Sequence, residues 1–143
     1  MIEGASMNYW LMKSEPGTWS WDDQVRAGVA EWDGVRNYQA SNNMKAMALG
    51  DLVFFYHSVS EKRIVGIAEV AKLYYPDPTD KSGRFGMVDV RAIRPMIEPV
   101  TLAQIKDDPR LQDLALIRQS RLSVLPLTAD QWRMICAMGK TEP

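Results

Sequence analysis

The sequence predicts a single α+β domain, a small, partly open β-barrel of five or six strands with short flanking helices. Short runs rich in Val, Ile, Phe and Tyr, which strands favour, alternate with brief helical segments along the whole chain. No strand–helix–strand series recurs, which argues against a parallel βαβ sheet. At 143 residues, of which 46% are hydrophobic, the chain has the size and apolar content of one domain with one core.

The first two elements are marked by the residues at their ends. Residues 9–12 form an apolar run that stops at Pro16, which predicts a buried strand. Ser20 can cap a helix over residues 21–27, and Gly28 provides the C-terminal stop of that helix. A strand followed by a short capped helix is therefore expected to open the domain.

The middle of the chain predicts a helix and a hairpin. A helix over residues 38–49 places its apolar side chains on one face and ends at Gly50. Two runs rich in β-branched and aromatic residues follow, over residues 51–57 and 64–73. The polar residues 58–62 between them are typical of a hairpin loop, so the two runs are expected to pair.

The last part of the chain predicts a surface loop and a terminal helix. Residues 75–83 hold too many turn residues for a regular element, and this loop is a candidate for ligand contact. Thr128 and Gln131 form a capping box, which predicts a helix through Met138. The other expected elements are a strand over residues 87–93, a short helix over residues 102–106 and a strand over residues 123–125.

The charge of the chain limits its partners. It carries 17 Lys and Arg against 18 Asp and Glu, a formal net charge of -1 and a pI near 5.8. No global positive field attracts a polyanion, so basic side chains must be grouped locally if nucleic acid is the partner. Dense, non-specific coating of DNA is therefore not expected.

Several other classes of protein and site are excluded or disfavoured. No apolar run reaches the length of a membrane span and no signal peptide is visible, so we expect a cytoplasmic protein with no membrane partner. A single cysteine, Cys136, excludes an internal disulfide, and its helical spacing from Trp132 favours a buried position. The sequence has no paired metal-ligand spacing and no glycine-rich phosphate loop, so neither a metal nor a cofactor is expected. Residues 1–6 show no pattern and read as an extended start or a remnant of protein expression.

Three segments place aromatic rings beside hydrogen-bonding groups, namely residues 9–16, 32–40 and 54–58. This combination suits a flat ligand with polar edges, such as a base extruded from a nucleic acid. Extrusion costs a few kcal/mol, and each aromatic stack returns about 1–3 kcal/mol. Two rings with hydrogen bonds to the base edge can therefore balance the cost, whereas one ring cannot.

The chain resembles the EVE domain family over nearly all of residues 7–140, and a single EVE domain is expected there. The residues that carry the resemblance are Trp10-Leu11-Met12-Lys13-Ser14-Glu15-Pro16, Trp32-Asp33-Gly34-Val35-Arg36-Asn37-Tyr38-Gln39-Ala40, Phe55-Tyr56-His57-Ser58, Met87-Val88-Asp89-Val90 and Arg121-Leu122-Ser123 with Pro126-Leu127. The resemblance implies a PUA-like fold, a mixed β-barrel with flanking helices related to the YTH readers of methylated adenine in RNA. It also implies a reader of modified bases in DNA, particularly methylated or hydroxymethylated cytosine.

The resemblance, together with the chemistry of the three segments, suggests which residues form the site. The candidate base pocket comprises Lys13, Ser14, Glu15, Trp32, Asn37, Tyr38, His57, Ser58 and Phe85. The candidate phosphate contacts are Arg36, Lys45 and Arg84, with Lys13 as a further cation. Two positions depart from the family pattern: Phe85 stands where a tryptophan is common, and Ser41 stands where an arginine is common. A phenylalanine can stack but has no indole N–H, and Ser41 removes one contact to a base or phosphate.

Plainer interpretations stand beside these. Trp10 is expected in the core, and Trp19 and Trp21 flank a helix start, as a hydrophobic staple does. Arg36 can anchor a loop through an ion pair, and His57 can be a structural histidine hydrogen-bonded in the barrel.

The main alternative functions are an enzyme and an RNA reader. An ASCH-type hydrolase or RNA-processing enzyme acting on a modified nucleoside could use Lys13, Glu15, His57 and Ser58, although the sequence lacks a recognisable catalytic motif. A YTH-like pocket could equally take a base from RNA. As the resemblance covers only the reader, any downstream action falls to a separate effector protein such as a nuclease.

Overall fold

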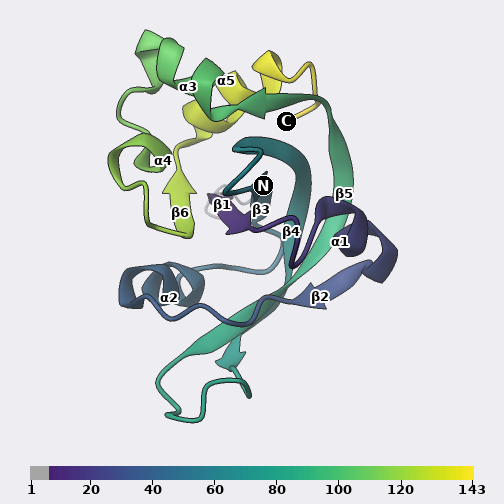
Figure 1. Ribbon diagram of the computed structural model, residues 1–143, viewed down its shortest axis with the longest axis vertical. Helices are drawn as coiled ribbons and strands as arrows, with labels where there is room; N and C mark the ends of the chain where they lie inside the picture. The colour runs from purple at the N-terminus through teal and green to yellow at the C-terminus, as the bar shows by residue number, and fades with distance from the viewer. Residues whose placement is uncertain (1–6) are drawn as a thin grey trace, which may run out of the picture.

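The computed structural model describes residues 7–143, so the proposed extended start at residues 1–6 lies outside the described chain. Its elements, in chain order, are β1 (Tyr9–Ser14), α1 (Trp21–Ala27), β2 (Val29–Glu31), α2 (Tyr38–Lys45), β3 (Leu52–His57), β4 (Arg63–Pro76), β5 (Gly86–Thr101), α3 (Leu102–Asp107), the 3-10 helix η1 (Pro109–Leu111), α4 (Ala115–Arg118), β6 (Val124–Leu127) and α5 (Ala129–Met138). Figure 1 shows the short helices distributed around one strongly curved sheet.

All six strands belong to one mixed sheet, in the order β2-β5-β4-β3-β1-β6. β1 and β3 are parallel and are joined by a crossover that contains α1, β2 and α2, while every other neighbouring pair is antiparallel. β4 and β5 are 14 and 16 residues long, and their register shifts four times, which allows both strands to bend (Figure 1). The sheet stays open, with β2 and β6 as its edges. The expected α+β class is confirmed, with an open, mixed six-stranded sheet and short helices.

β3 supports both faces of the sheet with two adjacent phenylalanines. Because successive residues of a strand point to opposite faces, Phe54 and Phe55 serve different parts of the molecule. Phe54 stacks on Trp132 of α5 with 3.7 Å between ring centroids. Phe55 meets the edges of Trp21, at the start of α1, and of Trp32, at 5.3 and 5.4 Å. The ring of Phe55 therefore ties α1 to the segment that follows β2.

The predicted Ser20 cap and the predicted capping box at Thr128 are both confirmed, and the Ser20 cap proves to be a capping box as well. At α1, the Ser20 hydroxyl accepts from the Asp23 N–H and the Asp23 carboxylate accepts from the Ser20 N–H, at 3.1 and 3.0 Å. At α5, Thr128 and Gln131 make the same reciprocal pair at 3.0 and 2.9 Å. Cys136 on α5 is buried, as its spacing indicated, and burial raises the pKa of its thiol to about 11.

The helix expected over residues 38–49 is too long by one turn, because α2 ends at Lys45. The carboxylate of Asp51 accepts a hydrogen bond from the Ala48 N–H at 2.9 Å, which removes that donor from a continuing helix. Gly50 then takes a φ of 85°, a conformation that glycine adopts without strain. Gly50, which was expected to end the helix, therefore lies in a separate turn beyond it.

The other differences between the predicted and the observed elements have local causes. β2, η1 and α4 were not predicted, because each has only three or four residues, too few for a periodic pattern to stand out. β5 continues past the expected end at residue 93, since Pro95 lies opposite Gly66 at a register shift, where a missing N–H is tolerated. The loop expected over residues 75–83 begins only after Pro76, the last residue of β4.

Within residues 7–143, no helix is long and apolar enough to cross a membrane.

Candidate functional site

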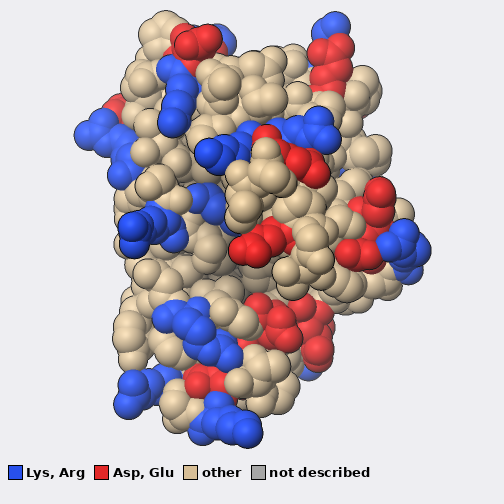
Figure 2. Space-filling view, viewed as in Figure 1, with Lys and Arg blue, Asp and Glu red and all other residues tan. Residues whose placement is uncertain are grey.

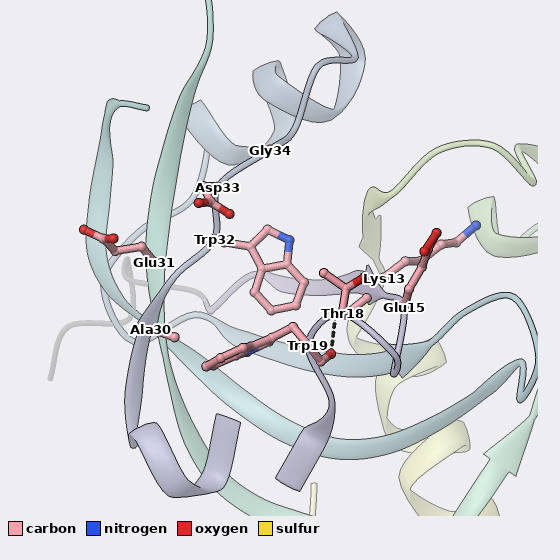
Figure 3. A pocket seen from close by; sticks show the side chains of 10 residues that line it. Lys13, Glu15, Thr18, Trp19, Ala30, Glu31, Trp32, Asp33 and Gly34 are labelled. Carbon is pink, nitrogen blue, oxygen red and sulfur yellow. Dashed lines mark hydrogen bonds between the residues drawn. The ribbon is translucent and has the colours of Figure 1, made fainter. Parts of the chain in front are cut away.

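A cavity of about 580 Å³ lies between the end of β1 and the segment that leaves β2. Its volume is in the range of small-molecule and cofactor sites. The residues that line it are Lys13, Ser14, Glu15, Thr18, Trp19, Ala30, Glu31, Trp32, Asp33 and Gly34. Figure 3 shows that two indole rings, those of Trp19 and Trp32, form walls of this cavity.

Trp32 is held in place by contacts with two strands of the sheet, β3 and β5. Its backbone N–H donates to the carbonyl of Val88 on β5 at 2.8 Å, and its ring meets the Phe55 ring edge-on at 85°. Only 8% of Trp32 is exposed, and in Figure 3 its side chain points into the cavity. This wall is therefore already in place before any ligand arrives.

Trp19 is fixed by a buried glutamine. The Trp19 indole N–H donates to Gln24 Oε1 at 2.9 Å, and Gln24 Nε2 donates to the carbonyls of Gly28 and Val90 at 3.2 and 3.1 Å. Gln24 is fully buried. The backbone carbonyl of Trp19 also accepts from the Ser14 hydroxyl at 2.5 Å. Trp19, expected from the sequence to be part of a staple, thus lines the cavity in a set orientation.

The polar residues of the cavity divide into two groups. Lys13 and Ser14 are occupied by protein partners: the Lys13 ammonium donates to the Ser120 carbonyl at 2.8 Å, and Ser14 bonds to the Trp19 carbonyl. Burial lowers the pKa of Lys13. Glu15 and Thr18 are exposed, and their side chains form no hydrogen bond with residues 7–143. These two side chains are therefore free to meet a polar ligand.

Residues 30–33 alternate across the cavity wall, as a strand requires. Figure 3 shows Ala30 and Trp32 directed inward and Glu31 directed away. The Glu31 carboxylate accepts at 3.4 Å from the Tyr75 hydroxyl, which also donates to Asp89 at 2.6 Å. Burial and these two carboxylates raise the pKa of Tyr75. The inner side of β2 is therefore apolar, whereas its outer side is acidic.

The segment after Trp32 is clasped to the loop that follows β4. Asp77 accepts from the Gly34 N–H at 2.8 Å and from the Arg36 guanidinium at 3.0 Å, and Thr79 donates to it as well. Burial alone raises the pKa of the Asp77 carboxyl, but the hydrogen bonds from Thr79, Gly34 and Arg36 prevail and lower it to about 2. Arg36 therefore has a structural anchor, which was one of its two interpretations from the sequence.

Several residues expected in the base pocket lie outside the cavity lining. Asn37 caps α2 by accepting from the Ala40 N–H at 2.9 Å. Tyr38 and Phe85 pack on each other, with 4.9 Å between ring centroids. His57 is buried: its Nε2 accepts from the Trp21 N–H at 3.0 Å, and its Nδ1 lies 2.8 Å from Glu61. Ser58 donates its N–H to the Ser14 carbonyl at 2.9 Å and so braces the end of β1.

The remaining candidates for phosphate contact are spread out. The Lys45 ammonium lies 5.4 Å from the centre of the Tyr74 ring, and Arg84 is exposed on the loop after β4. Ser41, the position where an arginine is common in the family, is buried and shares a 2.8 Å hydrogen bond with Tyr74. The structure therefore brings together Lys13, Ser14, Glu15 and Trp32, and not the other candidates.

Six lining residues were not predicted, namely Thr18, Trp19, Ala30, Glu31, Asp33 and Gly34. The one available signal was the alternation of small, acidic and aromatic residues over residues 30–33, which marks a short edge strand. Trp19 carried no local signal, because its place depends on Gln24, whose partners come from distant β5. Among residues 7–143, no three His, Cys, Asp or Glu side chains are grouped to hold a metal ion.

Comparisons with known proteins agree with this fold. The mouse (Mus musculus) protein thymocyte nuclear protein 1 is 35% identical over 175 aligned positions, which cover 95% of this chain and 75% of the mouse protein. An NMR structure of a Rhodopseudomonas palustris protein is 54% identical, covers 94% of both chains and has a TM-score of 0.89. The crystal structure of human THYN1 protein in complex with 5-methylcytosine-containing DNA is 34% identical, covers 95% of this chain and 99% of that one, and has a TM-score of 0.85. The profile of the EVE domain matches residues 8–138. The chain belongs to the EVE domain family.

Proposed function

We propose that this protein binds DNA containing a modified cytosine, methylated or hydroxymethylated, and holds the extruded base in the cavity between Trp19 and Trp32. The human relative crystallised with 5-methylcytosine-containing DNA supports this choice of ligand class. The observation that carries the proposal for this chain is the pair of fixed indole walls around a cavity of about 580 Å³. No cofactor is needed for such binding.

The indole walls supply the main favourable term. An extruded base gives up its pairing and stacking, which costs a few kcal/mol. Contact with an aromatic ring returns about 1–3 kcal/mol per base, so two rings offset the cost where one falls short. Because Phe55 and Gln24 already hold the two indoles, little side-chain entropy is lost on binding.

The polar mouth of the cavity supplies the hydrogen bonds. A cytosine edge presents an exocyclic amino donor and ring acceptors, and the free side chains of Glu15 and Thr18 match those two needs. Lys13 and Ser14 act mainly by fixing the mouth, through Ser120 and Trp19. Of the residues that the sequence suggested, Glu15 and Trp32 therefore receive direct roles.

Discrimination of the modification depends on the fit of the cavity. Burying one methyl group contributes about 0.8 kcal/mol, roughly a fourfold preference. A larger preference requires walls that leave a void when the methyl group is absent. Fixed indoles satisfy that requirement, since they cannot collapse onto a smaller base.

The test is a binding panel of short labelled oligonucleotides. DNA and RNA versions carry one cytosine, 5-methylcytosine, 5-hydroxymethylcytosine or methylated adenine, and each is titrated with the wild type and with Trp32→Ala. We expect methylated or hydroxymethylated cytosine in DNA to bind tightest, and Trp32→Ala to erase that preference. Ile97→Ala, an exposed apolar truncation on β5 outside the cavity lining, is the matched control and should bind as the wild type does.

Other outcomes would replace the proposal. Tighter binding of the RNA versions would identify a YTH-like RNA reader. Equal or absent binding of every oligonucleotide would direct attention to free modified nucleosides, and turnover of one that is lost in Lys13→Ala would identify an enzyme. Restriction or repair after binding is the task we assign to a separate effector protein.

A further inference from the structure

A second hollow, of about 330 Å³, lies next to the cavity. Its lining consists of Asn37, Gln39, Gln119, Ser120, Arg121 and Leu122. Two connections join it to the cavity. The ammonium of Lys13, which lines the cavity, donates to the Ser120 carbonyl of the hollow at 2.8 Å. Gly34 of the cavity also precedes Asn37 of the hollow by three residues, a span of at most about 10 Å.

The hollow is a surface of donors without acidic residues. None of its six lining residues is Asp or Glu. Arg121 is exposed and makes no ion pair or hydrogen bond with the residues that the structure describes. Asn37 uses its side-chain oxygen to cap α2, so its amide NH₂ remains a donor. The hollow therefore offers one full positive charge and neutral donors, which is a set suited to a phosphate group.

The outer side of β2 has the reverse charge. The Glu31 carboxylate is directed away from the cavity there, and Asp89 of β5 lies beside it through the shared Tyr75 hydroxyl. In Figure 2, acidic side chains gather toward the part of the face where α1 and β2 lie, and basic side chains predominate on the left, toward α2 and α4. Phosphates of a bound strand are repelled from the first side and attracted to the second.

We propose that this hollow binds the phosphodiester next to the extruded nucleotide, with Arg121 as its principal contact. The inference rests on the proposed function, since it takes the base in the cavity as its starting point. It assigns a direction to the strand: away from β2 and over the loop of residues 119–122. It also explains how a chain with a net charge of -1 can hold a polyanion, through a local contact instead of a global field.

The test compares salt dependence in two charge-matched variants. Arg121→Gln and Arg133→Gln each remove one exposed positive charge, but Arg133 lies on α5 and pairs with Asp130. Single-site 5-methylcytosine and unmodified DNA oligonucleotides are titrated at several salt concentrations. For Arg121→Gln we expect about tenfold weaker binding of both at low salt and a slope of log K against log salt reduced by about 1. The ratio between the two oligonucleotides should stay unchanged, and Arg133→Gln should match the wild type.

Each alternative result is informative. An unchanged slope in Arg121→Gln, with base preference intact, overturns the phosphate site and leaves the base reader standing. A lost base preference in Arg121→Gln shows that Arg121 contacts the base, which also overturns the phosphate assignment. A wild type without base preference, whose slope still falls in Arg121→Gln, retains the phosphate site and rejects the proposed reader.

Discussion

Two pairs of aromatic residues lie near the site, and they differ in what they enclose. Trp19 and Trp32 are each held by a third residue, Gln24 and Phe55, and line an open cavity. Tyr38 and Phe85 are held by each other, at 4.9 Å between ring centroids, and line no part of that cavity. Each ring of the second pair contacts the other ring, whereas each indole of the first pair is supported by another residue and borders the cavity. The means by which a ring is supported therefore separates a binding wall from a packing contact.

The largest expected effect on binding follows removal of the Trp32 indole, one of the two walls of the cavity. Trp32→Ala should weaken binding of a 5-methylcytosine oligonucleotide by about 1–3 kcal/mol, roughly fivefold to 150-fold, since one stacking contact is lost. Fluorescence anisotropy with a labelled oligonucleotide measures this directly. Circular dichroism should show a folded variant, because Trp32 lies at the rim of the core. Affinity within twofold of the wild type would remove Trp32 from the site.

The second largest effect is expected on removal of Gln24, the side chain that holds Trp19 in place. Gln24→Leu removes the acceptor of the Trp19 indole N–H and one donor each from the carbonyls of Gly28 and Val90, of which that of Gly28 keeps the Ala92 N–H. It should reduce the free energy of unfolding by about 2–3 kcal/mol. It should also weaken base binding, because Trp19 is released. In a Trp19→Phe background, Gln24→Leu should cost less affinity, since the indole N–H is already gone. Equal costs in both backgrounds would show that Gln24 does not position Trp19.

The clasp at Asp77 should appear in the pH dependence of stability. The folded pKa of Asp77 is lowered to about 2 from about 4 in the unfolded chain, so its contribution is present above about pH 4 and is lost as the pH falls through 2. The expected contribution is about 2 kcal/mol.

Urea unfolding at pH 5 and pH 2.5 tests this. Asp77→Asn should be less stable than the wild type at pH 5, and that difference should shrink at pH 2.5. Asp130→Asn is the control, because it removes an exposed carboxylate on α5 whose surface ion pair with Arg133 contributes little to stability. A stability gap for Asp77→Asn that is the same at both pH values would contradict the clasp.

The smallest expected effect on base binding concerns Tyr38 and Phe85, the two rings that pack on each other. Phe85→Ala should cost about 1 kcal/mol of stability through its lost contact with Tyr38, and change base affinity less than twofold. The same anisotropy assay applies. A loss as large as that of Trp32→Ala would instead place Phe85 against the base, as the family resemblance implies, and would end the distinction between the two pairs.

What the sequence could predict depended on how local each signal was. Thr128 and Gln131 are three residues apart, and their capping box was visible in the sequence, as was the Ser20 cap of α1. The α+β class followed from strand-rich runs with brief helices. Trp32, Lys13, Ser14 and Glu15 were placed through the family resemblance, and the structure brings these four together.

The missed features are long-range. Trp19 becomes a wall only because Gln24 bridges it to Val90, which lies 66 residues beyond Gln24 in the chain. His57 had two interpretations in the sequence, a structural one and a place in the pocket, and only its contacts with Trp21 and Glu61 show the structural one. Phe85 pairs with Tyr38 across 47 positions, a contact that no periodicity reveals. Sequence patterns thus located the site, and tertiary contacts decided which rings face it.

The most direct test of whether Trp19 and Trp32 hold the base uses the five tryptophans as internal probes. Their indole N–H signals are assigned by Trp→Phe variants and followed by NMR during titration with a 5-methylcytosine oligonucleotide. We expect large, saturable shifts for Trp19 and Trp32 and much smaller ones for Trp10, Trp21 and Trp132, which are buried away from the cavity lining. Saturable binding that leaves the signals of Trp19 and Trp32 unmoved would contradict a base held between these two indoles.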